Sequence, residues 1–186
     1  IIENSLKLFS QKGFYNTTIP DIAKAMKMSV GNMYNYFSSK EELAKFAIKY
    51  STNILAEELK EINQLDVSSK EKIYIFVKRY LENVQNSPEV IEYFLRVYLS
   101  NREVFKQGCE GFLCVGEFVT EVMILLEEGA SKKEFRQQDF FPAFSMIMGC
   151  LGGFAFLSGE NVLDKDLLSY SDSVADNIYR ALKYDE

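Results

Sequence analysis

Apolar positions recur at three- and four-residue steps along nearly the whole chain, which is the period of an amphipathic α-helix. In the first predicted helix, Ile2, Leu6 and Phe9 share one face. Gly13 then predicts its end, because glycine is favoured just after the last turn of a helix. Proline and glycine are scarce, at 3 and 10 of 186 residues, which disfavours a turn-rich β-structure. We therefore expect an all-α fold of about nine helices, with the short ones first.

Capping residues divide the first part of the chain into short helices. Thr18 is a candidate N-cap, with Asp21 three residues later to complete a capping box. After a short break, Ser29 is the next candidate N-cap, and Phe37 ends that second helix. Residues 39–42, Ser-Lys-Glu-Glu, form a further capping-box sequence. It begins a long helix that reaches about residue 62.

Residues 18–37 therefore have the outline of a helix-turn-helix, in which the second helix enters the DNA major groove N-terminus first. Met33 and Phe37 lie four residues apart and are predicted to face the core. The opposite face presents asparagine, which can pair with base edges, and tyrosine, whose hydroxyl can reach a phosphate. The alternative is an ordinary helical hairpin with packed tyrosines and exposed asparagines. The candidate DNA-facing residues are Gly31, Asn32, Asn35, Tyr36 and Lys40.

Charge is unevenly distributed along the chain. The net charge of −6 looks wrong for a nucleic-acid binder. Residues 1–46, however, contain six lysines and four acidic residues, and the rest of the chain is strongly acidic. Such asymmetry is typical of a small polyanion-facing module on an acidic body. We therefore predict a DNA-binding domain over residues 1–46 and a second domain over residues 47–186.

The stretch GFYNTTIPDIAKAMKMSVGNMYNYFSSKEEL, residues 13–43, resembles the DNA-binding signature of TetR-family transcriptional regulators. In that family, G-[FY]-x-x-T-[ST]-[VI] leads to D-I-A and then to G-V-S-x-G-x-[LI]-Y-x-[YH]-F-x-[SN]-K-E-x-L. The match extends over these 31 residues at fixed spacing without gaps. Lys27 replaces the usual glycine of the turn, so either this residue accepts a strained or left-handed backbone at a cost of about 1 kcal/mol, or the turn differs slightly. The matching residues are Gly13, Phe14, Thr17, Thr18, Asp21, Ile22, Ala23, Ser29, Gly31, Tyr34, Tyr36, Phe37, Lys40, Glu41 and Leu43.

The resemblance implies an all-helical homodimer with an N-terminal three-helix DNA-binding domain and a C-terminal helical domain for ligand binding and dimerisation. Such regulators mostly act as repressors that a small molecule releases from a palindromic operator in double-stranded DNA. The alternative is a helical small-molecule-binding protein with weakened or lost DNA binding, which the unusual Lys27 would fit. By position, the residues that would face bases are Val30, Gly31, Asn32 and Asn35, those that would contact phosphates are Thr18, Tyr34, Tyr36 and Lys40, and Lys27 and Ser29 complete the predicted DNA-binding set.

Residues 70 to 127 are rich in aromatic side chains. Such side chains suit the lining of a mostly apolar pocket for a small hydrophobic or aromatic ligand. Ordinary core packing would explain each of them equally well. No cofactor is expected. The candidate pocket residues are Phe76, Tyr80, Tyr93, Phe94, Tyr98, Phe112 and Phe118.

Residues 140–157 contain no charged residue and are at the short limit for a membrane span. A helix that is apolar all round in a soluble protein is buried in a core or in a subunit interface. We therefore favour core packing or a homodimer interface over contact with a membrane. The candidate interface residues are Phe141, Phe144, Met148, Leu151, Gly152, Phe156, Val174 and Ile178.

Several kinds of chemistry are disfavoured by composition. The chain has no histidine, which excludes histidine-based triads and most zinc sites, and it shows no phosphate-binding loop. We therefore predict neither an enzyme nor a metal site. No secretory signal is seen, so the cytoplasm is the default location. The three cysteines, Cys109, Cys114 and Cys150, are expected to be small buried apolar residues, with a redox-sensing thiol as the alternative.

Overall fold

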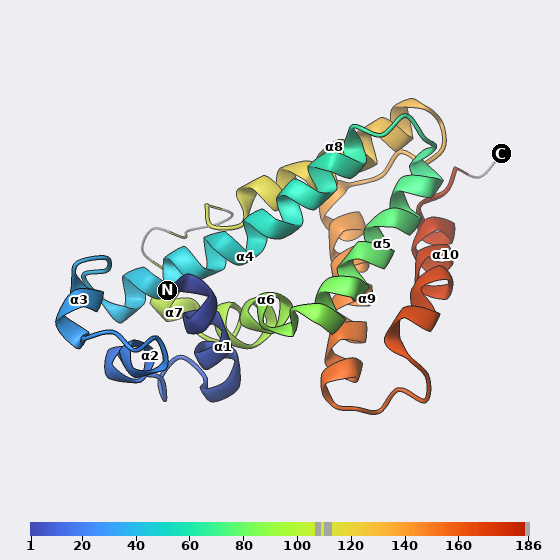
Figure 1. Ribbon diagram of the computed structural model, residues 1–186. Coiled ribbons are helices and arrows are strands. Elements are labelled where there is room, and N and C mark those ends of the chain that lie inside the picture. Colours follow the sequence, from blue (N-terminus) through green and yellow to red (C-terminus); the bar gives the residue numbers. More distant parts are fainter. Residues whose placement is uncertain (107–108, 110–112, 185–186) are drawn as a thin grey trace. The chain divides into compact units, whose positions relative to one another are not determined.

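The computed structural model describes residues 1–106, 109 and 113–184 (Figure 1). These residues form ten α-helices, a π-helical segment and a 3₁₀ segment, and a single antiparallel bridge joins Phe135 to Lys183. The all-α fold class is confirmed. The number of helices exceeds the expected number of about nine because residues 88–105 are divided among three short helical segments.

Three short helices precede the long α4, as the capping residues predicted. Their order can be followed by colour in Figure 1. The elements are α1 (Ile2–Lys12), α2 (Ile19–Ala25), α3 (Val30–Tyr34), α4 (Lys40–Asn63), α5 (Ser69–Asn86), α6 (Pro88–Glu92), the π-helix η1 (Tyr93–Tyr98), α7 (Arg102–Phe105), α8 (Gly116–Ser131), α9 (Phe140–Gly159), the 3₁₀ helix η2 (Leu167–Tyr170) and α10 (Ser171–Leu182).

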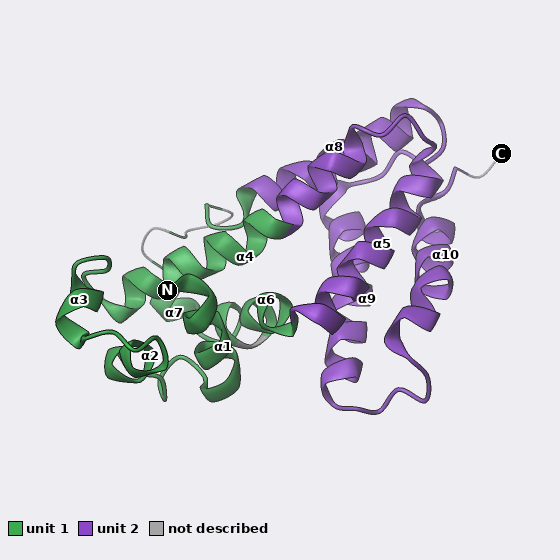
Figure 2. Ribbon diagram, viewed as in Figure 1, with its two compact units in different colours: residues 1–54, 88–116 green, residues 55–87, 117–186 purple. Residues whose placement is uncertain are grey.

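The chain divides into two compact units, which Figure 2 shows in different colours. Unit 1 comprises Ile1–Ile54 and Pro88–Gly116, and unit 2 comprises Leu55–Ser87 and Glu117–Glu186. Helix α4 contributes residues to both units. The sequence-based domain boundary after residue 46 also lies within α4.

Aromatic packing holds the core of unit 1. The ring of Phe9 in α1 stacks on Phe14 at a centroid distance of 5.7 Å and lies 5.8 Å from the ring of Tyr93 in η1. The Tyr93 hydroxyl donates a hydrogen bond to the Ala44 carbonyl of α4 at 2.9 Å. Burial raises the pKa of Tyr93, so its hydroxyl stays protonated and remains a donor. One buried tyrosine thus ties η1 to both α1 and α4.

In unit 2, helix α8 lies very close to the segment that directly follows it. Gly129 in α8 is buried, and a Cβ atom at this position would overlap the ring of Phe135. The Gly129 carbonyl accepts hydrogen bonds from the amides of Glu134 and Phe135 at 2.9 and 3.0 Å. Glycine is therefore required for the tight turn that buries Phe135 after α8.

A buried ion pair crosses the core of unit 2. The Lys72 ammonium, whose side chain is 1% exposed, donates to the Glu128 carboxylate and to the Asn63 carbonyl, both at 2.7 Å. The Asn63 amide in turn donates to the carbonyl and carboxylate of Glu121. Burial opposes the ionisation of Glu128, but hydrogen bonds from Lys132 and Lys72 outweigh it and lower the pKa of the carboxyl. This network ties α4, α5 and α8 together.

Helix α9 buries only one narrow face within the chain. Ala143, Ile147 and Leu151 are buried, whereas Phe141 and Phe156 are 59% and 60% exposed. The helix is long and apolar enough to cross a membrane by length and composition alone, with 17% of its most apolar stretch buried. The predicted burial of this helix in the core therefore holds for one face only.

The predicted interface residues fall into two groups. Leu151, Val174 and Ile178 are buried inside the chain itself, where they pack in the core of unit 2. The remaining members are at least partly exposed along α9. An interface therefore depends on the second group, which consists of Phe141, Phe144, Met148, Gly152 and Phe156.

Candidate DNA-binding site

Thr18 begins α2 with the predicted capping box. Its hydroxyl oxygen accepts a hydrogen bond from the Asp21 amide at 3.2 Å, and the Asp21 carboxylate accepts from the Thr18 amide at 3.0 Å. The Thr18 hydroxyl also donates to the same carboxylate at 2.7 Å. These bonds, the side-chain bond first, lower the pKa of Asp21. Thr18 is predicted to contact phosphate. Its side chain is exposed, but its hydroxyl already forms two hydrogen bonds in the helix cap.

The turn between α2 and α3 holds Lys27 in the left-handed conformation, at φ 56°. Its amide donates to the Lys24 carbonyl at 3.1 Å, and the next amide, of Met28, donates to the Ala23 carbonyl at 2.9 Å. Of the two alternatives for this turn, the structure has the left-handed backbone, although lysine replaces glycine. Within the described part of the chain, the exposed Lys27 side chain forms no hydrogen bond or ion pair.

Helix α3, the predicted recognition helix, is held in place from one side. Ser29 caps it, since its hydroxyl oxygen accepts the Asn32 amide at 3.2 Å. Met33 and Phe37 are buried, which confirms the predicted core-facing pair. The Phe37 ring meets the Phe46 ring of α4 edge-on at 5.5 Å. These contacts turn the opposite face of α3 outward.

That opposite face is open and carries polar groups. Tyr34 and Tyr36 are 53% and 60% exposed. The Asn35 amide donates only a long bond, 3.4 Å, to the side-chain oxygen of Asn32. At Gly31, a Cβ atom would meet nothing within 4 Å, so the backbone is accessible there. The structure thus groups six of the predicted DNA-binding residues on one exposed surface: Val30, Gly31, Asn32, Tyr34, Asn35 and Tyr36.

Lys40, predicted to contact phosphate, is engaged within the chain. Its ammonium donates to the carbonyls of Phe14 and Thr17 at 2.9 and 3.0 Å and lies 4.3 Å from the centre of the Phe14 ring. Sequence reasoning had no signal for these bonds, because the partners are 26 and 23 residues away. Lys40 therefore stands apart from the exposed surface of α3.

The capping box predicted at the start of α4 is present in one half and shifted by one residue in the other. The Ser39 hydroxyl accepts the Glu42 amide at 3.0 Å, as expected. The Glu42 carboxylate, however, accepts from the hydroxyl and amide of Ser38, both at 2.6 Å, rather than from the Ser39 amide. These two bonds lower the pKa of Glu42. The double serine thus satisfies both halves of the cap.

The aromatic residues predicted to line a ligand pocket are shared between the two units. Phe76 and Tyr80 of α5 and Phe118 of α8 are buried in unit 2, where the rings of Phe76 and Phe118 lie 6.3 Å apart. Burial raises the pKa of Tyr80. A separate cavity of about 210 Å³ in unit 2 is lined by residues such as Met123 and Phe140, and by none of the predicted pocket residues that the structure describes.

The other candidate pocket residues belong to unit 1. Tyr93 is part of the core described above. The ring of Phe94 stacks on that of Tyr98 at 5.5 Å, and Tyr98 meets Phe105 edge-on at 5.1 Å. Burial raises the pKa of Tyr98. Phe112 lies outside the described residues.

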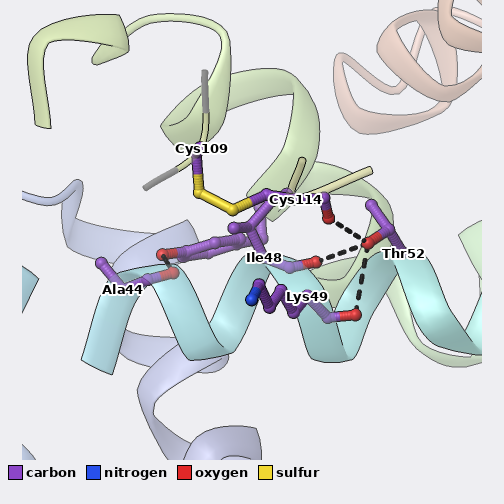
Figure 3. The surroundings of a disulfide bond; sticks show 7 residues. Ala44, Ile48, Lys49, Thr52, Cys109 and Cys114 are labelled. Atoms are coloured by element: carbon purple, nitrogen blue, oxygen red, sulfur yellow. Dashed lines mark hydrogen bonds between the residues drawn. A yellow bond between two sulfur atoms is a disulfide. The ribbon is translucent and has the colours of Figure 1, made fainter. Parts of the chain in front are cut away.

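Cys109 and Cys114 form a disulfide bond, which corrects the expectation of separate buried thiols (Figure 3). Both residues lie outside the helices. The Cys114 carbonyl accepts a hydrogen bond from the Thr52 hydroxyl of α4 at 2.9 Å. Cys150 remains a free thiol, and burial raises its pKa.

The fold and this site define an N-terminal helix-turn-helix module that is followed by a larger set of helices. Residues 1–46 match the family described as bacterial regulatory proteins, tetR family. The match identifies the N-terminal module as a TetR-family domain and confirms the resemblance predicted from residues 13–43.

Curated relatives support the same assignment over part of the chain. Over 50 residues, the chain is 50% identical to the uncharacterized HTH-type transcriptional regulator YuxN of Bacillus subtilis, an alignment that covers 27% of this chain and 17% of that protein. Over 103 residues it is 28% identical to IcaR of Staphylococcus aureus, a negative transcriptional regulator of the biofilm operon icaADBC, covering 53% of this chain and 50% of IcaR. The alignments thus span half or less of these relatives.

Solved structures extend the likeness to the whole fold. FadR of Bacillus subtilis, in complex with stearoyl-CoA, superposes with a TM-score of 0.83 at 20% identity, over 96% of this chain and 95% of that one. FadR of Bacillus halodurans gives 0.84 at 20% identity, over 99% and 95%. KstR2 of Mycobacterium tuberculosis gives 0.74 at 15% identity, over 99% and 93%. At these identities the likeness establishes the fold.

Proposed function

We propose that the chain is a homodimeric DNA-binding repressor that a small hydrophobic ligand releases from its operator. The observation that carries this proposal is the division of α3 into a buried and an open face. Met33 and Phe37 anchor the helix, while the asparagines and tyrosines on the other side are exposed.

Each exposed group suits a different part of DNA. The side-chain amides of Asn32 and Asn35 can pair with base edges, adenine best of all. The accessible backbone at Gly31 allows close approach to the groove floor. The hydroxyls of Tyr34 and Tyr36 can donate to phosphates, and the exposed ammonium of Lys27 adds a charge beside them.

A palindromic operator requires two recognition helices at a fixed spacing of about 34–36 Å, and a homodimer provides them. The exposed apolar face of α9 supports such a dimer, since Phe141 and Phe156 would be costly to leave in water. The proposed interface also includes the partly exposed Phe144, Met148 and Gly152.

The proposal of a hydrophobic ligand is supported by the aromatic character of the candidate pocket residues, which are mostly buried and lie outside the cavity at Met123 and Phe140. The complex of B. subtilis FadR with stearoyl-CoA makes long-chain acyl-CoA the first ligand class to test. A ligand releases DNA only if it binds the non-operator conformation more tightly. We therefore expect addition of stearoyl-CoA to lower operator affinity; unchanged operator affinity at saturating ligand would exclude this class.

DNA binding is tested by fluorescence anisotropy with the DNA that flanks the chain's own coding region. Asn35→Ala removes a base contact and is expected to lower affinity about ten-fold or more. Tyr34→Phe removes a phosphate contact and should cause a smaller loss. Tyr184→Phe, a half-exposed tyrosine in unit 2, is the control and should bind like the parent chain. Parent-like binding by both test variants would refute the assigned surface.

A further inference from the structure

The ammonium of Lys40 is held by three contacts within unit 1, which we call the Lys40 seat. Lys40 is the first residue of α4, and its ammonium donates two hydrogen bonds to carbonyls in the connection between α1 and α2. The third side of the ammonium lies against the Phe14 ring, at 4.3 Å, where a cation–π attraction adds to the bonds. Charged hydrogen bonds of this length are stronger than neutral ones.

The connection that Lys40 holds is also tied to the rest of unit 1 by other contacts. Thr17 is fully buried, and its hydroxyl donates to the carbonyls of Gly13 at 2.8 Å and Leu8 at 3.3 Å. Phe14 is buried against Phe9. The next residue after Thr17 is Thr18, the N-cap of α2. A shift of the Lys40 seat would therefore move the start of the helix-turn-helix itself.

Moving Lys40 to a DNA phosphate would disrupt this arrangement. Both carbonyls, which are part-buried, would lose a charged donor, and the Phe14 carbonyl would keep only the long bond from the Thr17 amide, at 3.4 Å. Losing a hydrogen bond to a charged group destabilises a part-buried carbonyl. A phosphate on the open surface would replace two short bonds and a ring contact by one solvent-screened contact. The seat is therefore the more favourable place for the ammonium.

We propose that Lys40 is a positioning residue for DNA binding, which clamps the α1–α2 connection to the first turn of α4, and is not a phosphate contact. This inference rests on the proposed DNA-binding function. Because α4 continues to Asn63, any displacement of its first turn would be passed through Lys40 to the start of α2. The recognition helix would then follow α4 as one body.

The salt dependence of DNA binding separates the two roles. Loss of one phosphate contact makes the slope of log K against log salt shallower by about 0.9 and weakens all DNA sequences alike. Loss of a positioning residue misplaces the recognition helix, so it weakens the operator selectively. For Lys40→Met, we expect operator affinity to fall on the order of ten-fold, with an unchanged slope and unchanged affinity for unrelated DNA.

Lys27→Met is the matched control. It removes an equally charged side chain that has no partner in the described residues. It should show the phosphate-contact behaviour, a shallower slope and equal loss on both DNAs. Should Lys40→Met fail to fold by circular dichroism, Lys40→Gln replaces it, since glutamine also removes the charge but keeps a donor for one carbonyl.

Two outcomes would overturn the proposal. One is a slope that becomes shallower by about 0.9 in the Lys40 variant, with equal losses on both DNAs. The other is unchanged amide hydrogen exchange over Ile19–Ala25 in the DNA-free Lys40→Met protein, where faster exchange is expected and Lys27→Met should show none. The exchange experiment uses no DNA. It therefore still tests the clamp if the parent chain shows no operator preference, which would refute the proposed function alone.

Discussion

The region of α2 and α3 and the core of unit 2 use polar side chains in opposite ways. In the first, Thr18 bonds to Asp21 and Ser29 to Asn32, each only three residues away. In the second, the bond from Lys72 to Glu128 spans 56 residues. The polar groups of the first region satisfy the ends of their own helices, whereas those of the second hold separate helices together.

This difference has consequences for both stability and function. Capping bonds near the surface exchange water for protein partners at small net gain, and they leave the outer face of α3 free. A buried ammonium is not solvated by water, so its charge is stabilised mainly by its ion-pair partner. We therefore expect substitutions in the two regions to differ greatly in their cost.

The largest effect is expected at the buried ion pair. Glu128→Gln should lower the free energy of unfolding by about 3 kcal/mol, because it leaves the Lys72 charge buried without a counter-ion. Urea denaturation measures this loss. Glu127→Gln alters the exposed neighbouring glutamate and should change stability by less than about 0.5 kcal/mol. Equal losses in the two variants would show that the pair is not the important contact.

The same pair predicts a pH dependence. The pKa of Glu128 is lowered in the folded chain, from an ordinary value of 4.5, so the folded state favours the ionised carboxyl. Its contribution to stability is therefore complete above pH 4.5 and is lost as the pH falls below it through the lowered pKa. Between these limits, the parent chain should lose more stability on acidification than Glu128→Gln. Parallel pH profiles would contradict this assignment.

The contrast also explains what could be read from the sequence. The caps at Thr18 and Ser29, the buried pair Met33 and Phe37, and the left-handed turn at Lys27 all depend on neighbours within a few residues. Short-range patterns therefore predicted them, together with the all-α fold.

Interactions between distant segments were missed for the same reason. The seat of Lys40 and the Lys72–Glu128 pair join residues more than twenty positions apart. One signal was present: Lys72 lies four residues before Phe76 and thus on the buried stripe of α5. The bond between Cys109 and Cys114 is close in sequence, but its geometry depends on chain outside the helices, which periodicity does not describe.

A smaller effect is expected at the cap of α2. Thr18→Ala removes the hydroxyl that accepts the Asp21 amide, and should lower the free energy of unfolding by about 1 kcal/mol. Thr18→Ser keeps the hydroxyl and should stay close to the parent in the same urea titration. A loss as large as that of Glu128→Gln would break the distinction between local and long-range polar contacts.

The smallest change in stability is expected at Lys27, where the backbone and the charge can be separated. Lys27→Gly relieves the left-handed strain but loosens the unfolded chain, so stability should rise by less than about 1 kcal/mol. Lys24→Gly, in the last turn of α2, should instead lower stability by about 1 kcal/mol, since glycine there only weakens the helix. Opposite signs in urea titrations of these two variants would establish that the turn requires the left-handed backbone.

Lys27→Gly should nevertheless reduce the salt dependence of DNA binding as Lys27→Met does, because both remove the same charge. If Lys27→Gly instead destabilises the chain as much as Lys24→Gly, the Lys27 side chain stabilises the folded turn. That result would contradict the view that Lys27 serves only to supply a charge for DNA.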